Sequence, residues 1–199
     1  SLMDTEIDYD NLTAIGCMMG SGGLIVMDDS NCMVDIAKFF LDFTVDESCG
    51  KCSPCRIGTR RMQEILEKII AGKATLDDLD KLEELAHYIK ENSLCGLGQT
   101  APNPVLATLK FFREEYIAHI VDKKCPAGVC KALLSFKIDK DLCIGCGLCA
   151  RNCPVSAIGK TDYIAEGHKL PSYEIDTAKC IKCGVCLENC KRAKAISKG

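Results

Sequence analysis

Apolar residues recur at helical spacing in four stretches of the chain between residues 31 and 121. Each stretch opens with residues that favour a helix start, and Gly72 ends the second one. The start signals are Asn31, Pro54, the Thr75–Asp78 pair that resembles a capping box, and Asn103 followed by Pro104. Because the later loops are short, the pattern predicts antiparallel helices packed as a four-helix bundle over residues 31–121.

The segments on either side of the predicted bundle have different patterns. Residues 1–30 look like the tail of a small β domain, in which glycines surround a short strand candidate at 24–27. Residues 122–135 form a connector that contains Lys, Pro and Gly, and residues 136–199 contain an internal repeat. In that repeat the run from Phe136 to Cys143 returns 37 residues later. The expected fold class is therefore α+β.

Cysteine dominates the composition, at 16 of 199 residues. The net charge of −3 argues against the basic face of a duplex-DNA-binding protein, and 47% hydrophobic residues argue against disorder. No secretory leader and no run of about 18 apolar residues is visible, so we expect a cytoplasmic protein without a membrane span. Metal binding is then favoured over disulfides. The chain starts without Met, and we expect it to be the C-terminal part of a longer polypeptide.

Each half of the repeat carries a run of four cysteines with the same spacing, Cys-x2-Cys-x2-Cys-x3-Cys. In bacterial two-cluster ferredoxins this spacing holds [4Fe–4S] clusters, and the fourth cysteine of each run binds the other cluster. The spacing thus predicts a first crossed set, Cys143, Cys146, Cys149 and Cys190, and a second crossed set, Cys180, Cys183, Cys186 and Cys153. Zinc and disulfides are the alternatives, but zinc sites pair their cysteines differently. Lys191 follows Cys190 where these ferredoxins usually have Pro, which bears on the local turn and potential rather than on assembly.

A third group of cysteines lies within the predicted bundle. Cys49, Cys52 and Cys55 fall between the first and second helices, and Cys95 falls between the third and fourth. In an up-down-up-down bundle these two loops lie at the same end, so the four thiolates can converge on a third [4Fe–4S] cluster. We call Cys49, Cys52, Cys55 and Cys95 the bundle set. The alternative is a surface redox disulfide.

These motifs resemble a known family. The segment from Glu47 to Gly58, E-S-C-G-K-C-S-P-C-R-I-G, and the later L-C-G-L-G are similar to the cluster-binding bundle of the NADH-oxidising flavoprotein subunit of respiratory complex I. The preceding G-S-G-G-L-I-V-M-D-D resembles the end of that subunit's ubiquitin-like (SLBB-type) domain. The appended ferredoxin-like domain resembles the β subunit of electron-bifurcating, NAD(P)-linked [FeFe]-hydrogenases and relatives in NAD-dependent formate dehydrogenases.

The resemblance implies an electron-transfer role with no catalytic residue in this segment. It implies three [4Fe–4S] clusters here, and FMN and NAD(P) sites only in an upstream domain, whose motifs are absent from this sequence. The implied partners are a hydrogenase or formate dehydrogenase catalytic subunit, a small [2Fe–2S] subunit and soluble ferredoxin, in a hetero-oligomer without nucleic acid. The alternative from another class is a non-catalytic iron–sulfur carrier or structural module.

Four cysteines remain after the three sets, and three of them lie near a histidine. Cys125 and Cys130 follow His119 closely, and Cys32 starts the first helix at the end of the bundle where the fourth helix stops. Thiolates and imidazole suit Zn²⁺. We therefore predict a structural zinc site, the Cys3His set, made of Cys32, His119, Cys125 and Cys130, which would pin the connector as a hinge. A surface histidine with buried free thiols is the alternative, and Cys17 is expected to be a small buried residue.

Overall fold

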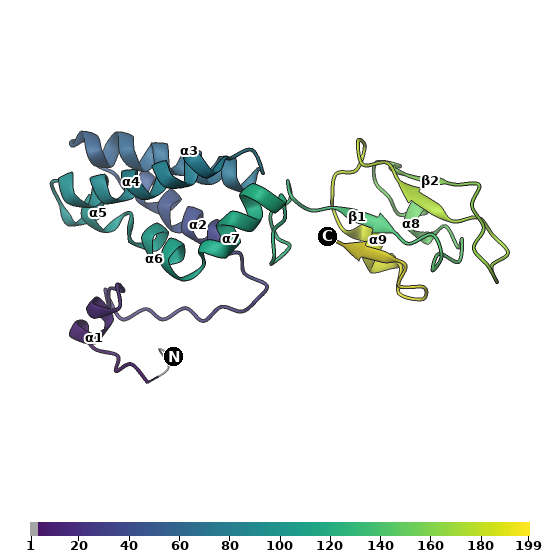
Figure 1. The fold of residues 1–199 in the computed structure, drawn as a ribbon, viewed down its shortest axis with the longest axis horizontal. Helices are drawn as coiled ribbons and strands as arrows, with labels where there is room; N and C mark the ends of the chain where they lie inside the picture. Colours follow the sequence, from purple (N-terminus) through teal and green to yellow (C-terminus); the bar gives the residue numbers. More distant parts are fainter. Residues whose placement is uncertain (1–3) are drawn as a thin grey trace. The chain divides into compact units, whose positions relative to one another are not determined.

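The computed structural model describes residues 4–199, which divide into two compact units that meet between Leu133 and Leu134 (Figure 1). The first unit is helical, and the second is built from short strands and two short helices. Among the described residues no helix is both long enough and apolar enough to cross a membrane. The observed mixture of helices with small sheets agrees with the expected α+β class.

The four predicted helical stretches are all helical in the first unit, and two of them are divided. The first is α2, the second is a π-helical turn that continues into α3, and the third is α4. The fourth is divided among α6, α7 and a second π-helical turn, and the short α5, which the pattern does not predict, precedes it. The bounds are α2 Met33–Asp46, η1 Pro54–Gly58, α3 Thr59–Ile70, α4 Leu76–Asn92, α5 Gly96–Thr100, α6 Asn103–Phe111, α7 Arg113–Ile117 and η2 Ala118–Asp122.

The starts of α4 and α2 are capped in different ways, by a neighbouring residue at α4 and by a residue distant in the sequence at α2. At α4 the predicted capping box is present, because the Thr75 side chain accepts from the Asp78 backbone N–H and the Asp78 side chain accepts from that of Thr75. At α2 the predicted cap, Asn31, is wrong, since Cys32 occupies the N-cap position without a side-chain hydrogen bond. The Glu115 carboxylate instead accepts from the Met33 N–H at 3.0 Å. A residue 82 positions away in the sequence thus satisfies this helix end.

The core of the first unit is aliphatic and lies between α2, α3, α4 and α6. Leu41, Leu66 and Leu82 are fully buried in it. The one large aromatic residue among its buried members is Tyr116, whose hydroxyl lies 2.7 Å from the Thr108 hydroxyl. The hydrogen bond between them gives both buried hydroxyls a partner.

The burial of Leu66 gives a stability prediction for this core. Leu66→Ala removes apolar contacts and leaves a cavity at a site with 0% exposure, so we expect a loss of about 2–5 kcal/mol in the free energy of unfolding. Leu76→Ala makes the same chemical change at a side chain that is 52% exposed, and we expect a loss well under about 1 kcal/mol. Anaerobic chemical denaturation of both variants measures the difference. Equal losses would contradict the described core.

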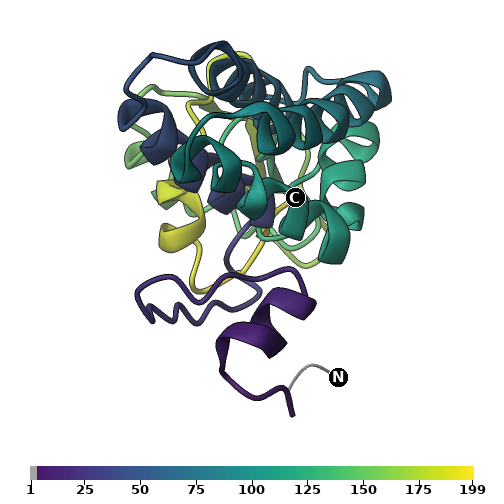
Figure 2. The ribbon, with the colours of Figure 1, turned by 90° about the vertical axis from the view of Figure 1, so that its left-hand side faces the viewer.

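Residues 4–31 differ from the prediction. They contain α1, Tyr9–Ala14, which has no buried residue, and the segment lies outside the packed helices (Figure 2). The strand expected at 24–27 does not form, and the side chains of Leu24, Ile25 and Val26 are 79%, 64% and 86% exposed. A strand needs a hydrogen-bonded neighbour, and the described part of the chain provides none here. The ubiquitin-like domain itself stays a prediction.

The second unit repeats one motif twice, as the internal repeat predicts. Its strands are β1 Phe136–Ile138, β2 Ile158–Lys160, β3 Tyr173–Ile175 and β4 Ile196–Lys198, and its helices are α8 Leu148–Arg151 and α9 Val185–Asn189. The antiparallel pairs are β1 with β4 and β2 with β3, so each two-stranded sheet takes one strand from each half of the repeat. This exchange closes the unit around a small core of Phe136, Ile158, Ile175 and Ile196.

Candidate functional site

Each half of the second unit presents its cysteines from a loop that turns into a short helix. Gly147 and Gly184 precede α8 and α9 with φ of 71° and 80°, a left-handed conformation that glycine adopts without strain. A Cβ on Gly147 would also lie 2.8 Å from the Tyr173 hydroxyl. These glycines therefore let the chain reverse tightly and aim the following helix, with Cys149 or Cys186 on it, toward the interior.

The structure brings together the cysteines of both crossed sets. Cys143, Cys146, Cys149 and Cys190 line one cavity, and Cys180, Cys183, Cys186 and Cys153 line another. In each cavity three cysteines come from one run and the fourth from the other run. Most of the remaining lining is aliphatic or aromatic, with Ile138 and Tyr173 in the first cavity and Phe136 and Ile175 in the second. Both cavities are thus largely apolar, and the cysteine thiols are the groups in them that can bind metal.

Two thiols of the crossed sets disfavour ionisation. Burial, and then the neighbouring Cys143 and Cys146, raise the pKa of Cys149 to about 11. Burial also raises the pKa of Cys186. Backbone N–H groups already point at two other sulfurs, since Ala157 donates to Cys153 at 3.3 Å and Lys182 donates to Cys180 at 3.4 Å. Such donors stabilise thiolate once a cation is bound.

The two loops that carry the bundle set lie next to each other. Cys55 is buried in the π-helical turn η1, and Cys95 is the N-cap of α5. The Leu94 backbone N–H, and then that of Cys55, lower the pKa of the Cys52 thiol. Cys55 also has a hydroxyl neighbour, because its Sγ lies 3.3 Å from the Ser48 Oγ. The two loops predicted to share an end of the bundle therefore do meet.

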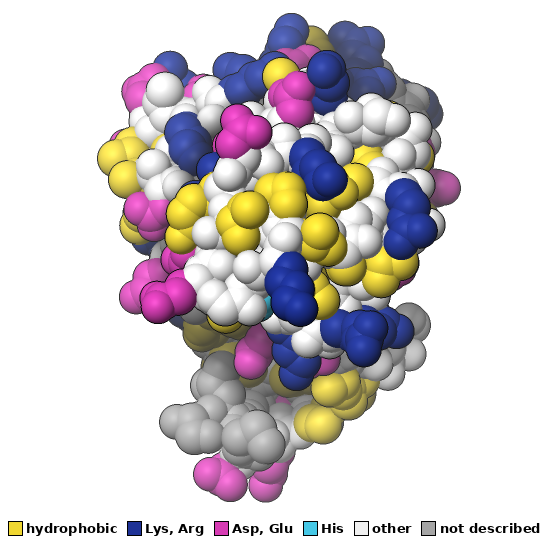
Figure 3. Space-filling model, turned by 90° about the vertical axis from the view of Figure 1, so that its right-hand side faces the viewer, with side chains coloured by type: hydrophobic (Ala, Val, Ile, Leu, Met, Phe, Trp, Pro, Cys, Tyr) yellow, Lys and Arg dark blue, Asp and Glu magenta, His cyan; other side chains and the backbone are white. Residues whose placement is uncertain are grey.

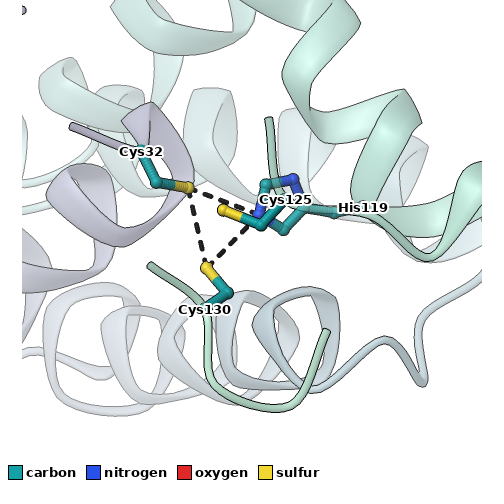
Figure 4. Close-up of side chains that lie close together, drawn as sticks. All are labelled: Cys32, His119, Cys125 and Cys130. Carbon is teal, nitrogen blue, oxygen red and sulfur yellow. Dashed lines mark hydrogen bonds between the residues drawn. The ribbon is translucent and has the colours of Figure 1, made fainter. Parts of the chain in front are cut away.

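The Cys3His set forms the tightest constellation of titratable side chains in the described part of the first unit. The Nε2 atom of His119 lies 3.3 Å from the sulfurs of both Cys32 and Cys130, and those sulfurs are 3.7 Å apart. All four ligand atoms, including that of Cys125, lie within 4.8 Å of one another (Figure 4). Every member is buried, and His119 has 0% exposure. The alternative of a surface histidine is therefore wrong.

The surroundings of His119 select the nitrogen that faces the sulfurs. Its Nδ1 lies 2.7 Å from the Glu115 carbonyl, which accepts the Nδ1 proton, so that Nε2 is the nitrogen that can bind a metal in exchange for its own proton. His119 belongs to the π-helical turn η2, and turns of this kind are frequent at functional sites. The cysteine and histidine motifs do not identify Glu115 as part of the site. Its position four residues before His119 on a predicted helix is the feature of the sequence that could have identified it.

Without a metal, two of these four groups form a charged pair. A hydrogen bond from Cys130 and then contact with His119 lower the pKa of Cys32 to about 4, and the same pairing raises that of Cys130. We therefore assign the negative charge of this pair to Cys32, since Cys130 donates to it. Burial alone would lower the pKa of His119, but the Cys32 sulfur and the Glu115 carbonyl raise it to about 9. One thiolate and one imidazolium thus face each other in the buried site.

Cys17 belongs to none of these sets. The expectation that it is buried is wrong, since it is exposed in the segment that precedes α2. A substitution of Cys17 can therefore serve as the control for substitutions of the cysteines in the three sets and the Cys3His set.

Comparison with known proteins identifies both units. Residues 35–119 match the family model of the NADH-ubiquinone oxidoreductase-F iron-sulfur binding region, and residues 142–194 match that of a 4Fe-4S dicluster domain. Both regions bind 4Fe–4S clusters in their families, so this chain is an iron–sulfur segment of the electron-transfer kind. The resemblance of the first unit to the complex I flavoprotein subunit, and of the second unit to a two-cluster domain, is confirmed by these matches.

Curated relatives and solved structures extend the comparison. The NADP-reducing hydrogenase subunit HndC of Solidesulfovibrio fructosivorans is 58% identical over 159 residues, which are 80% of this chain and 32% of HndC. The F 2 subunit of NADH-quinone oxidoreductase of Rhizobium meliloti is 44% identical over 124 residues, 62% of this chain and 30% of that protein. A solved NAD+-reducing [NiFe]-hydrogenase in the H2-reduced state is 38% identical with a TM-score of 0.48, over 50% of this chain and 17% of that one. The chain spans about a third of the length of these curated relatives.

Proposed function

Given an iron–sulfur region of the oxidoreductase-F kind followed by a dicluster domain, we propose that this chain is the electron-transfer part of an NAD(P)H-linked flavoprotein subunit of a hydrogenase. The observation that carries the proposal is the presence of three cysteine quartets in one chain. Two of them each line one cavity, and the third comes from two loops that lie next to each other. Bound [4Fe–4S] clusters would supply one-electron carriers there. The protein holds them with thiolates, keeps water away with aliphatic side chains and points backbone N–H groups at the sulfurs.

The charge of the second unit supports two clusters in it. Residues 134–199 carry eleven Lys and Arg against seven Asp and Glu, an excess of four positive charges. Each oxidised [4Fe–4S] cluster with four thiolates carries a charge of about −2, so two of them offset this excess. Lys and Arg side chains lie around exposed hydrophobic ones on the face drawn in Figure 3. The remaining 14 basic and 21 acidic residues belong to the first unit.

For the Cys3His set we propose a structural zinc ion. A tetrahedral ion about 2.3 Å from sulfur and about 2.0–2.1 Å from nitrogen holds its ligand atoms about 3.5–3.8 Å apart. The separations in the structure, 3.3 and 3.7 Å, are close to these values. Four protein ligands fill the coordination shell, which is typical of structural rather than catalytic zinc. The ion would tie the connector with Cys125 and Cys130 to the start of α2 and to η2, as a hinge before the second unit.

The similarity to these relatives extends the proposal to the rest of the assembly. We propose an upstream domain with FMN and NAD(P) sites, a hydrogenase catalytic subunit, a small [2Fe–2S] subunit and soluble ferredoxin as partners, with electron bifurcation between them. The similarity to HndC, a subunit of an NADP-reducing hydrogenase, favours hydrogenase over formate dehydrogenase as the partner. The test is to purify the full-length protein with its associated subunits and to measure H2-dependent reduction of NAD(P)+ with and without ferredoxin. Formate-dependent reduction without any H2-dependent reduction would reverse the choice of partner.

The number of clusters gives a direct prediction. We expect the chain, reconstituted anaerobically with iron and sulfide, to bind about twelve iron atoms, four for each of three clusters. On reduction it should give three low-potential electron paramagnetic resonance (EPR) signals. Fewer than three signals from fully loaded protein would contradict the proposal, and salt-sensitive binding of the loaded chain to nucleic acid would favour the structural-module alternative.

A further inference from the structure

The hydroxyl of Ser93 has no partner in the described structure. Ser93 ends α4 and is 5% exposed, and its Oγ is a buried side-chain oxygen without a hydrogen bond. Its backbone groups are satisfied, because its N–H donates to the Ile89 carbonyl at 3.1 Å and its carbonyl accepts from the Gln99 side chain at 3.0 Å. Burying a hydroxyl without a hydrogen-bond partner destabilises the fold, so this hydroxyl calls for an explanation.

The Ser93 side chain lies beside a member of the bundle set. A Cβ placed on Gly98 would lie 2.5 Å from the Ser93 Oγ and 3.1 Å from the Cys55 Cβ. These two atoms therefore flank the same point, and only a glycine at position 98 leaves it open. The other hydroxyl near Cys55, that of Ser48, already lies 3.3 Å from the Cys55 sulfur.

The residues that follow Ser93 face the same place. The Leu94 backbone N–H donates a hydrogen bond to the Cys52 sulfur, and Cys95 belongs to the bundle set. The Leu94 side chain is 80% exposed. Three consecutive residues thus contribute a hydroxyl, a backbone N–H and a thiol to one site, and the buried hydroxyl lacks a hydrogen-bond partner among the described residues.

We propose that Ser93 is a positioning and tuning residue whose hydroxyl donates a hydrogen bond to a sulfur atom of the iron–sulfur cluster held by the bundle set. A cluster gains negative charge when it is reduced, so a donor to its sulfurs stabilises the reduced form and raises its reduction potential. The acceptor for the buried hydroxyl is then the cluster itself, which explains why the protein alone offers none. The inference rests on the proposed function, since it requires a cluster at Cys49, Cys52, Cys55 and Cys95.

The test is an EPR-monitored redox titration of the iron-loaded chain and its Ser93→Ala variant. We expect the midpoint potential of the bundle cluster to shift to lower values in the variant, while the two other clusters keep theirs. Pulsed EPR in H2O and D2O should show the loss of one coupling to an exchangeable hydrogen. The matched control is Ser21→Ala, which makes the same change at an exposed serine of the segment before α2, outside the bundle set, and should shift nothing.

The outcomes separate this inference from the proposed function. If the unmodified chain gives no bundle-cluster signal, the proposed function fails first. If it gives the signal and Ser93→Ala changes neither its potential nor its hydrogen coupling, Ser93 only fills space and the inference is wrong. If Ser93→Ala does not retain the cluster, Ser93→Thr decides, because threonine keeps the hydroxyl. A retained cluster of near-normal potential in that variant supports the hydrogen bond, and loss in both variants overturns it in favour of packing.

Discussion

Replacing Cys153 by serine is expected to abolish the cluster whose other ligands, Cys180, Cys183 and Cys186, start 27 residues further along the chain. The reason is the exchange of strands and cysteines between the halves of the second unit, which sets Cys153 in the cavity of the second crossed set. A serine oxygen is a poor substitute for a soft thiolate ligand. Bound iron should fall from about twelve atoms by about one to four, depending on whether a three-iron remnant survives.

Pairs of variants identify which cluster is lost. Cys153→Ser and Cys183→Ser should lose the same EPR signal, and Cys190→Ser and Cys146→Ser should lose the other one, because each pair shares a cavity. The magnetic coupling between the two clusters should disappear in all four variants. Cys17→Ser removes an exposed cysteine outside the sets and should change neither iron content nor spectra. If Cys153→Ser instead matched Cys146→Ser, each run would bind its own cluster and the crossed assignment would be wrong.

The arrangement in which each cavity takes its fourth cysteine from the other run could be predicted because the sequence contains the same cysteine motif twice. Cys153 and Cys190 occupy the same position in two copies of one motif, so the pairing of one half with the other needs no knowledge of distant contacts. The capping box at Thr75 was predictable for a similar reason, since all its atoms lie within one helical turn. Chain order alone also brought Cys32 and His119 to the same end of the helices, where they are in contact.

Other features depend on partners that the sequence does not reveal. Glu115 caps α2 in place of Asn31 because folding brings α7 beside the start of that helix. The fourth predicted helix breaks at Phe112, where φ is −133° and ψ is 31°, although its apolar spacing continues. The missing hydrogen-bond partner of the Ser93 hydroxyl can be recognised only once its burial is known. A serine two residues before a cysteine at a helix end gives no signal of it in the sequence.

His119→Ala is expected to lower bound zinc from about one ion per chain to nearly none. The substitution removes the only nitrogen ligand of the Cys3His set and leaves three buried thiols that cannot all ionise together. Loss of a structural metal is among the largest effects of a single substitution, about 4 kcal/mol or more. In a unit of this size that lowers the melting temperature by roughly 10–20 °C. Metal analysis and thermal unfolding under anaerobic conditions measure both effects.

Two further variants separate a lost ligand from a damaged core. His87→Ala makes the same change at an exposed histidine of α4 and should keep both the zinc and the melting temperature. His119→Cys replaces the imidazole by a thiolate, and four cysteines also form structural zinc sites, so this variant should retain most of the ion. Zinc should leave the unmodified chain as the pH falls, because protons compete for the thiolates and the imidazole. A chain that binds iron but no zinc would show that these four residues pack together without a metal. A His119→Ala variant that keeps its zinc would show that the ion is bound without His119, and the proposed ligand set would be wrong.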